Sequence, residues 1–336
     1  MTGRIATVTL NPAIDQTVAI AHFAANTVNR VDWEQSDAGG KGVNVASFLA
    51  DFGEQVSVSG FLGQDNLELF QRLFQQKGLH NHFVPIAGKT RVNIKIVDDA
   101  QQQVTDINFP GAVPKADDLE KLWTAIDSLA KTHDWFVLSG SLPQGVPTTI
   151  YWDLVSHLKR AGKTVVLDTS GEPLKAALAA RPDLIKPNLK ELEDLLGHSL
   201  ESEADILQAA VDLLQRGLRW VVVSMGAEGA YFVTATEALH AQPDTVEVKS
   251  TVGAGDAMVA GTIAGLVRGN DWTDCARMGT AFSMSTLGQL GPHLPPSDQV
   301  RSLGDRVTIR TLSLPIPTPE TPLTPQLAKT ESGIDR

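Results

Sequence analysis

Short apolar runs alternate with longer amphipathic segments along the sequence, and this alternation leaves few possible folds. The apolar runs predict buried strands at residues 5–10, 56–61, 135–138, 164–167, 183–185 and 220–223. The segments between them predict helices at residues 119–130, 150–160, 189–196 and 204–214. Strands separated by helices favour a parallel sheet that is covered on both faces. We therefore expect an α/β protein.

Small polar or acidic residues follow several of the apolar runs. They are Asn11, Ser139, Asp168, Asn188 and Ser224. In open α/β sheets the ligand crevice lies at the carboxyl ends of the strands. These residues therefore predict a site along that edge, although polar residues can also simply mark where strands leave the core.

One segment has a period of two instead. Residues 91–97 place one set of side chains on each face of a strand, apolar Val92, Ile94 and Ile96 against polar Arg91, Asn93 and Lys95. Residues 98–102 form a polar turn, and residues 104–109 can return as the partner strand. A hairpin inside an α/β protein serves as a lid over the crevice or as a subunit contact. Residues 19–33 have no helical period and can add strands to the same small sheet.

The charge of the chain excludes one class of partner. The 336 residues include 28 Lys and Arg and 39 Asp and Glu, which gives a formal net charge of −11. Nucleic-acid affinity comes from clustered Lys and Arg, so we expect no nucleic-acid partner. A small phosphorylated ligand needs only a local basic pocket and stays compatible with this charge.

Several features predict a cytoplasmic protein with no membrane partner. Cys275 is the only cysteine, so no intramolecular disulfide can form, and a reducing compartment is the simplest fit. The N-terminal residues lack the basic and apolar regions of a signal peptide. The longest weakly polar stretch, residues 252–267, carries Asp256 and is shorter than the about 20 apolar residues of a membrane span.

The strongest candidate for chemistry is the segment 250–256, Ser-Thr-Val-Gly-Ala-Gly-Asp, which leads into a predicted helix. Gly253 and Gly255 allow the backbone to approach a ligand closely, and the free N–H groups of the helix start favour an anion. Asp256 cannot bind a phosphate there, but it can accept a proton from a hydroxyl that attacks one. A glycine turn with a capping Asp is the alternative.

Two further glycine or proline turns precede predicted helices. Residues 38–44, Ala-Gly-Gly-Lys-Gly-Val-Asn, lack the Gly-Lys-Ser/Thr of a P-loop, but Lys41 and Asn44 make contact with a polyol or phosphate plausible. In residues 186–191, Asn188 and Glu191 can either hold a hydrated Mg²⁺ or form a capping box.

Two turns after strands are more ambiguous. Residues 224–229 contain Gly226 and Gly229, and their N–H groups can touch a nucleotide phosphate or simply close a β-hairpin. Asp15, in the segment 11–15, can accept hydrogen bonds from sugar hydroxyls or lie on a surface turn. The eight histidines show no metal-ligand spacing, and no Ser/His/Asp arrangement is visible.

These motifs, in this order, resemble those of the ribokinase-like carbohydrate kinases, also called the PfkB family. The resemblance runs from about residue 5 to about residue 301. It rests on the segments 11–15, 39–44, 139–143, 186–191, 224–229 and 251–256. It implies a three-layer α/β/α sandwich with a mostly parallel central sheet and a small β-sheet lid formed by about residues 16–38 and 90–110. We expect this kinase domain to span residues 1–305. Residues 306–336 are then a Pro-rich tail that is extended or disordered.

The resemblance also implies roles for individual residues. The catalytic set is the general base Asp256 with an anion hole at Gly253, Ala254 and Gly255. The substrate-binding set is Asp15, Gly39, Gly40, Lys41, Asn44, Arg91, Asn93, Lys95 and Ser139. Arg91, with Lys95, holds the phosphate already present on the substrate. The nucleotide-binding set is Lys186, Asn188, Ser224, Gly226, Ala227, Glu228, Gly229 and Thr251. Glu191 holds Mg²⁺, directly or through water.

Within the family the chain looks most like the kinases that convert D-fructose 1-phosphate to fructose 1,6-bisphosphate. The segments 39–44, 61–66, 90–95 and 104–109 carry this likeness. The implied cofactors are ATP and Mg²⁺, and a monovalent cation is an additional candidate. The implied assembly is a homodimer through the lid. Kinases of tagatose 6-phosphate or fructose 6-phosphate are the close alternatives. A non-catalytic sugar-phosphate sensor and an NAD-dependent oxidoreductase are more remote, because Asp256 and the glycines are intact and no G-x-G-x-x-G follows the first strand.

Overall fold

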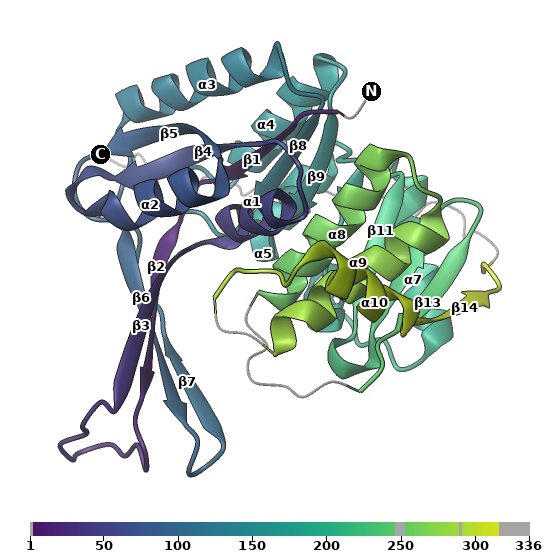
Figure 1. The fold of residues 1–336 in the computed structure, drawn as a ribbon. Helices are drawn as coiled ribbons and strands as arrows, with labels where there is room; N and C mark the ends of the chain where they lie inside the picture. Colours follow the sequence, from purple (N-terminus) through teal and green to yellow (C-terminus); the bar gives the residue numbers. More distant parts are fainter. Residues whose placement is uncertain (1–2, 246–252, 289–290, 316–336) are drawn as a thin grey trace, which may run out of the picture.

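A ten-stranded sheet forms the centre of the molecule (Figure 1). The computed structural model describes residues 3–245, 253–288 and 291–315. The strands, in their spatial order, are β14 (Thr308–Leu312), β13 (Ala238–Gln242), β12 (Ala230–Val233), β11 (Trp220–Ser224), β10 (Leu184–Ile185), β9 (Thr164–Asp168), β8 (Trp135–Ser139), β1 (Ile5–Thr9), β4 (Val56–Gly63) and β5 (His80–Ile86). The seven strands from β11 to β5 in this spatial order are all parallel to one another. Strands β12, β13 and β14 continue the sheet with antiparallel pairing.

Helices cover both faces of this sheet, so the predicted three-layer α/β/α architecture is confirmed. One face carries α3 (Ala116–Ala130), α4 (Ile150–Arg160), α5 (Gly171–Leu178), α6 (Leu189–Leu196) and α7 (Glu203–Gln215). The other carries α1 (Lys41–Asp51), α2 (Glu68–Lys77), α8 (Ala254–Arg268), α9 (Trp272–Leu287) and α10 (Ser297–Asp305). Neighbouring strand residues alternate between the two cores: Phe136 and Leu138 face α3 and α4, whereas Val137 faces α1 and α8.

The second sheet has four strands and extends away from the sandwich as a long blade (Figure 1). Its order is β3 (Trp33–Gly39), β2 (Ala13–Ala19), β6 (Arg91–Asp98) and β7 (Gln103–Ile107). The hairpin predicted from period-two alternation is therefore present as β6 and β7. Residues 19–33 contribute mainly the connection between β2 and β3 rather than strands of their own. We refer to these four strands as the lid.

The expected boundary between the domain and the tail at residue 306 is wrong. Thr308–Leu312 forms β14, which pairs with β13 and completes the main sheet. The physical reason is that β13 would otherwise present an open edge, while Ile309 and Leu312 supply apolar side chains for both faces. The proline-rich segment after residue 315 lies outside the described residues. Among the residues that the structure describes, no helix is long and apolar enough to cross a membrane.

Candidate active site

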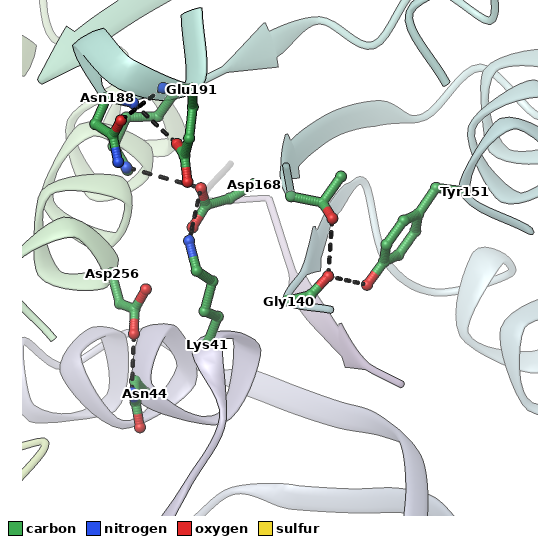
Figure 2. Close-up of polar contacts among 10 residues, drawn as sticks. Lys41, Asn44, Gly140, Tyr151, Asp168, Asn188, Glu191 and Asp256 are labelled. Carbon is green, nitrogen blue, oxygen red and sulfur yellow. Dashed lines mark hydrogen bonds and ion pairs between the residues drawn. The ribbon is translucent and has the colours of Figure 1, made fainter. Parts of the chain in front are cut away.

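The candidate site lies at the carboxyl ends of the parallel strands, and Asp256 is at its centre (Figure 2). Gly253 caps α8 with a left-handed φ of 78°, a conformation that glycine adopts without strain. This turn places Asp256 in the first helical turn, where its side chain is buried. Asn44, from the first turns of α1, donates from Nδ2 to Asp256 Oδ2 over 2.8 Å. Helices α1 and α8 therefore fix the position of this carboxylate together.

Burial raises the pKa of Asp256 from its ordinary value of 3.8 to about 6. Lys41 opposes this shift, and the negative charge of Asp168 adds to it. The hydrogen bond from Asn44 and the charge of Lys186 act in the same direction as Lys41. A carboxylate with such a pKa is ionised at neutral pH and still accepts a proton readily, which suits a general base.

Asp168 ends β9 beside Asp256 and binds two lysines. Lys41 Nζ lies 3.2 Å from Asp168 Oδ2, and Lys186 Nζ lies 3.7 Å from Oδ1. Burial alone would raise the pKa of Asp168, but the charges of Lys186 and Lys41 hold it below its usual range. In return, Asp168 raises the pKa of Lys41, so both members of the pair stay charged. The arrangement keeps one half-exposed and one buried ammonium group beside a buried carboxylate.

The first turn of α8 lies directly against one of these lysines. A Cβ atom at Gly255 would lie 3.3 Å from Lys186 Nζ, and Lys186 itself is only 5% exposed. The backbone N–H groups of Ala254 and Gly255 begin the helix and have no acceptor within it. A helix start and a buried ammonium group together favour an anion at this point.

Three buried oxygen atoms near these groups have no hydrogen-bond partner among the described residues: Thr9 Oγ1, Asn44 Oδ1 and Ser139 Oγ. Thr9 and Ser139 end the neighbouring strands β1 and β8, and Ser139 is paired with Asp168 in the sheet register. Buried polar atoms normally have partners. These three atoms are therefore available to form hydrogen bonds with a polar ligand.

The lid brings a second group of predicted residues together. Asp15 on β2 accepts a hydrogen bond from Asn93 Nδ2 on β6 over 3.2 Å, and the two residues are directly paired in the register. A Cβ at Gly39 would come within 2.2 Å of Asp15 Oδ2, so only glycine leaves room for this carboxylate. Burial raises the pKa of Asp15, with Asn93 and Arg91 acting in the opposite direction. Asp15 is thus a lid residue rather than a surface-turn residue.

Arg91 and Lys95 are on the same face of β6 but have different partners. The guanidinium of Arg91 donates to the carbonyl oxygens of Asn11, Pro12 and Phe109 at 3.1–3.3 Å. It is anchored where the lid meets the main sheet, and none of these partners neutralises its charge. Lys95 Nζ instead lies 2.6 Å from the carboxylate of Asp106 on β7. The structure therefore holds a charged Arg91 near the site, while Lys95 is paired across the lid.

The predicted nucleotide-binding residues lie on two adjacent strand ends. Asn188 and Glu191 form a reciprocal capping box at the start of α6, with bonds of 2.8 and 2.9 Å. The cap uses one oxygen of Glu191. Ser224 lies next to Asn188 through an isolated bridge, and residues 226–229 form the turn between β11 and β12. The hairpin alternative is therefore what the structure shows for that turn. Thr251 lies outside the described residues.

The protein side chains near Glu191 fit a metal ion whose ligands are mostly water and substrate oxygens. Among the described residues no group of three His, Cys, Asp or Glu side chains could hold a metal ion. Mg²⁺ typically takes one or two carboxylates and completes its shell with water and phosphate oxygens. Glu191, beside Asp168 and Lys41 (Figure 2), fits such a role.

Sequence reasoning missed Asp168 as a member of the site. It was visible only as one of several polar residues at strand ends, without a motif around it. Its importance comes from contacts with Lys41, which is 127 residues away along the chain. A pattern of local spacing cannot reveal such a pair.

The fold and this site define an α/β enzyme that brings an acidic proton acceptor and an anion-binding helix start to one point. The sequence model of the family described as "pfkB family carbohydrate kinase" matches residues 8–299, and the chain belongs to this family. It is 49% identical over 313 residues to a 1-phosphofructokinase of Rhodobacter capsulatus, which covers 93% of this chain and 99% of the relative. It is 38% identical to a 1-phosphofructokinase of Escherichia coli strain K12, with 92% and 99% coverage.

Solved structures agree with this assignment. A possible 1-phosphofructokinase of Thermotoga maritima superposes with a TM-score of 0.84 at 27% identity, covering 92% of this chain and all of the other. Phosphofructokinase-2 of Escherichia coli, in complex with potassium, superposes with a TM-score of 0.83 at 28% identity, with 90% and 98% coverage. The predicted ribokinase-like fold is therefore confirmed.

Proposed function

We propose that the protein transfers the terminal phosphoryl group of ATP to the 6-hydroxyl of D-fructose 1-phosphate. The products are fructose 1,6-bisphosphate and ADP. The observation that carries the proposal is the buried carboxylate of Asp256 at the glycine-capped start of α8, held by Asn44 and facing two lysines. The similarity to 1-phosphofructokinases over nearly the whole chain supports the choice of substrate.

In the proposed reaction, Asp256 accepts the proton of the 6-hydroxyl as its oxygen attacks the γ-phosphorus. The bond between that phosphorus and the β–γ bridging oxygen breaks, and ADP leaves. The N–H groups of Gly253, Ala254 and Gly255, with the ammonium of Lys186, stabilise the charge on the transferred group. Phosphoryl transfer depends mainly on positioning and charge stabilisation, and this arrangement supplies both.

The sugar binds between the lid and helix α1 in this proposal. Asp15 and Asn93 face its hydroxyls from the lid, and Lys41 and Asn44 do so from α1, with Gly39, Gly40 and Ser139 shaping the surface around it. The guanidinium of Arg91 binds the 1-phosphate, because Arg matches phosphate oxygens with two parallel hydrogen bonds. Lys95 contributes once its contact with Asp106 opens.

ATP binds along the ends of β10 and β11. Lys186 and Asn188 contact its phosphates, and Ser224 and the turn 226–229 line the nucleotide. Mg²⁺, held by Glu191 directly or through water, would neutralise the phosphate charge. A monovalent cation is a further proposed cofactor, supported by the potassium complex of phosphofructokinase-2. We place this activity in the cytoplasm, where the free, buried Cys275 fits a reducing compartment.

A homodimer through the lid completes the proposal. Strand β7 is exposed along its whole length and is one of the two edge strands of the lid, with Val104 and Ile107 on its surface. Exposed edges with apolar side chains pair readily with another strand or sheet. Replacement of either residue by Asp should convert dimers to monomers in analytical ultracentrifugation. The exposed Trp152 on α4, replaced by Asp, is the control that should leave the dimer intact.

A coupled ADP-release assay tests the proposed reaction. The panel is fructose 1-phosphate, fructose 6-phosphate, tagatose 6-phosphate and fructose, each with Mg-ATP and ranked by kcat/KM. A clear lead for fructose 1-phosphate is the expected result. A lead for a 6-phosphosugar would favour the second candidate, a 6-phosphosugar kinase, which the structural likeness to a fructose-6-phosphate complex of phosphofructokinase-2 supports. No turnover with any sugar would refute the kinase proposal.

A further inference from the structure

A cavity of about 310 Å³ opens at the opposite edge of the main sheet from the candidate active site. It lies at the amino ends of β1, β4 and β5, beside the end of α3. Its lining is rich in nitrogen: Arg4, Ser57, His80, His82, Thr132 and His133 are among the residues that form it. None of the lining residues is an Asp or a Glu. None of them belongs to the proposed kinase site.

The sheet register gathers these side chains on one face. Ser57 on β4 is paired with His80 on β5, and His82 follows two residues later on the same side of the strand. Helix α3 packs over this face, and the residues just after its end bring Thr132 and His133 to the cavity. Ser57 and His133 are buried and form the floor, whereas Arg4, His80 and His82 are exposed at the rim.

The floor of the cavity is a hydrogen-bonded pair that can reverse. His133 Nδ1 lies 3.1 Å from the carbonyl oxygen of Leu129, which can only accept, and 2.9 Å from Thr132 Oγ1, which can donate or accept. We assign the proton to Nδ1, which then donates to this carbonyl, while the hydroxyl of Thr132 donates to the same carbonyl over 3.4 Å. In the neutral ring, Nε2 therefore accepts from the hydroxyl of Ser57, 2.8 Å away. When the ring gains a second proton, Nε2 donates instead. The hydroxyl hydrogen of Ser57 is then released to donate into the cavity.

Among the lining residues the one fixed positive charge is the guanidinium of Arg4. Arg4 is exposed, and its carbonyl oxygen is held by the backbone N–H groups of Asp134 and Trp135. Burial lowers the pKa of His82, and the nearby His80 lowers it further. Burial also lowers the pKa of His133. The Leu129 carbonyl opposes this shift, His82 and Arg4 add to it, and Asp134 opposes it. Both shifts favour neutral rings at neutral pH, and a bound anion would favour the protonated rings.

We propose that this cavity is a binding site for a small dianion of the phosphate type. Arg4 pairs with its oxygens, His80 and His82 donate from the rim, and Ser57 donates from the floor. The volume is at the small end of the range for ligand sites and suits a phosphate group with at most a few carbon atoms attached. Binding takes up protons on His82 and His133, so affinity rises as pH falls.

Sulfate is the first probe, because it stays a dianion throughout the pH range in which only the protein titrates. Histidine ring signals are followed by NMR on the full-length protein at constant ionic strength and are assigned with His→Gln variants. We expect saturable shifts of the His80 and His82 signals at pH 6, with affinity at least about tenfold weaker at pH 8. Shifts that rise linearly, or that chloride reproduces, would overturn the proposal.

Arg4→Gln and His80→Gln test the residues themselves. Each should weaken sulfate binding by about tenfold, as expected for one lost charge-assisted hydrogen bond. Arg72→Gln and His198→Gln, which change the same residue types at exposed positions elsewhere, should have no effect. Circular dichroism establishes that each variant is folded. Unchanged binding in both cavity variants would assign the sulfate to another place on the protein and refute the site.

The same titration with inorganic phosphate and with 2-phosphoglycolate distinguishes the source of the anion. Tighter binding of phosphate would identify the free ion as the ligand, and tighter binding of phosphoglycolate would identify a small phosphorylated acid. Because the readout is histidine signals far from Asp256, it is independent of whether the kinase proposal holds.

Discussion

Replacement of Asp256 by Asn should have opposite effects on activity and stability. The side chain is buried, and the protein holds its pKa at about 6 rather than 3.8. With this raised pKa, keeping the carboxylate ionised inside the folded protein costs roughly 3 kcal/mol of free energy. Asn has the shape of the protonated acid and can still accept the hydrogen bond from Asn44. The substitution should therefore raise the free energy of unfolding at pH 7 by up to about 3 kcal/mol.

The pH dependence gives this prediction its sign. For an acid whose pKa is raised on folding, the folded state binds more protons than the unfolded state between the two pKa values. Wild-type stability contributed by Asp256 therefore falls as pH rises from about 4 to about 6. At pH 5 the wild-type carboxyl is already mostly protonated in the folded state, so the advantage of Asp256→Asn should shrink to about half of its value at pH 7.

Urea unfolding at pH 7 and pH 5 measures the gain in the free energy of unfolding of Asp256→Asn at each pH. The kcat for fructose 1-phosphate is measured on the same preparations. Loss of a general base should lower kcat by about 10²–10⁴-fold. Asp305→Asn, at an exposed position at the end of α10, is the matched control, and its stability should change by less than about 0.5 kcal/mol. An Asp256→Asn protein that is less stable than wild type at pH 7, or equally shifted at both pH values, would refute the reasoning.

Three further substitutions test other parts of the site. Arg91→Ala should raise KM for the sugar phosphate by about 10–100-fold with little change in KM for ATP, and equal effects on both would remove it from the phosphate site. Asp168→Asn leaves two lysines without their buried partner and should cost about 3 kcal/mol in urea unfolding, whereas an unchanged midpoint would contradict the ion-pair assignment. Gly39→Ala should displace the carboxylate of Asp15, which lies 2.2 Å from the added Cβ, and so lower kcat/KM for the sugar phosphate. Steady-state kinetics at saturating ATP measure this value, and an unchanged kcat/KM would contradict a role of Asp15 in binding the sugar.

The period of the apolar residues determined most of the fold. The six predicted strands are all present in the main sheet, because buried parallel strands need continuous apolar runs. The alternation of residues 91–97 likewise identified β6, since a strand that is covered on one face must have a period of two. The sequence also predicted the capping box of Asn188 and Glu191 as one of two alternatives, because such a box needs only two residues three apart at one helix start.

Only the tertiary structure decided which of these residues act together. Asp168 binds Lys41 across 127 positions of sequence, and Asn44 reaches Asp256 across 212. The raised pKa of Asp256 depends on burial between α1 and α8, and burial is a property of the packed chain rather than of a motif. The same is true of the histidine cavity, because Arg4, the strands β4 and β5, and the residues after α3 bring its side chains together from distant parts of the sequence. Local periodicity sets the elements, whereas the electrostatics of a site come from contacts that only folding brings about.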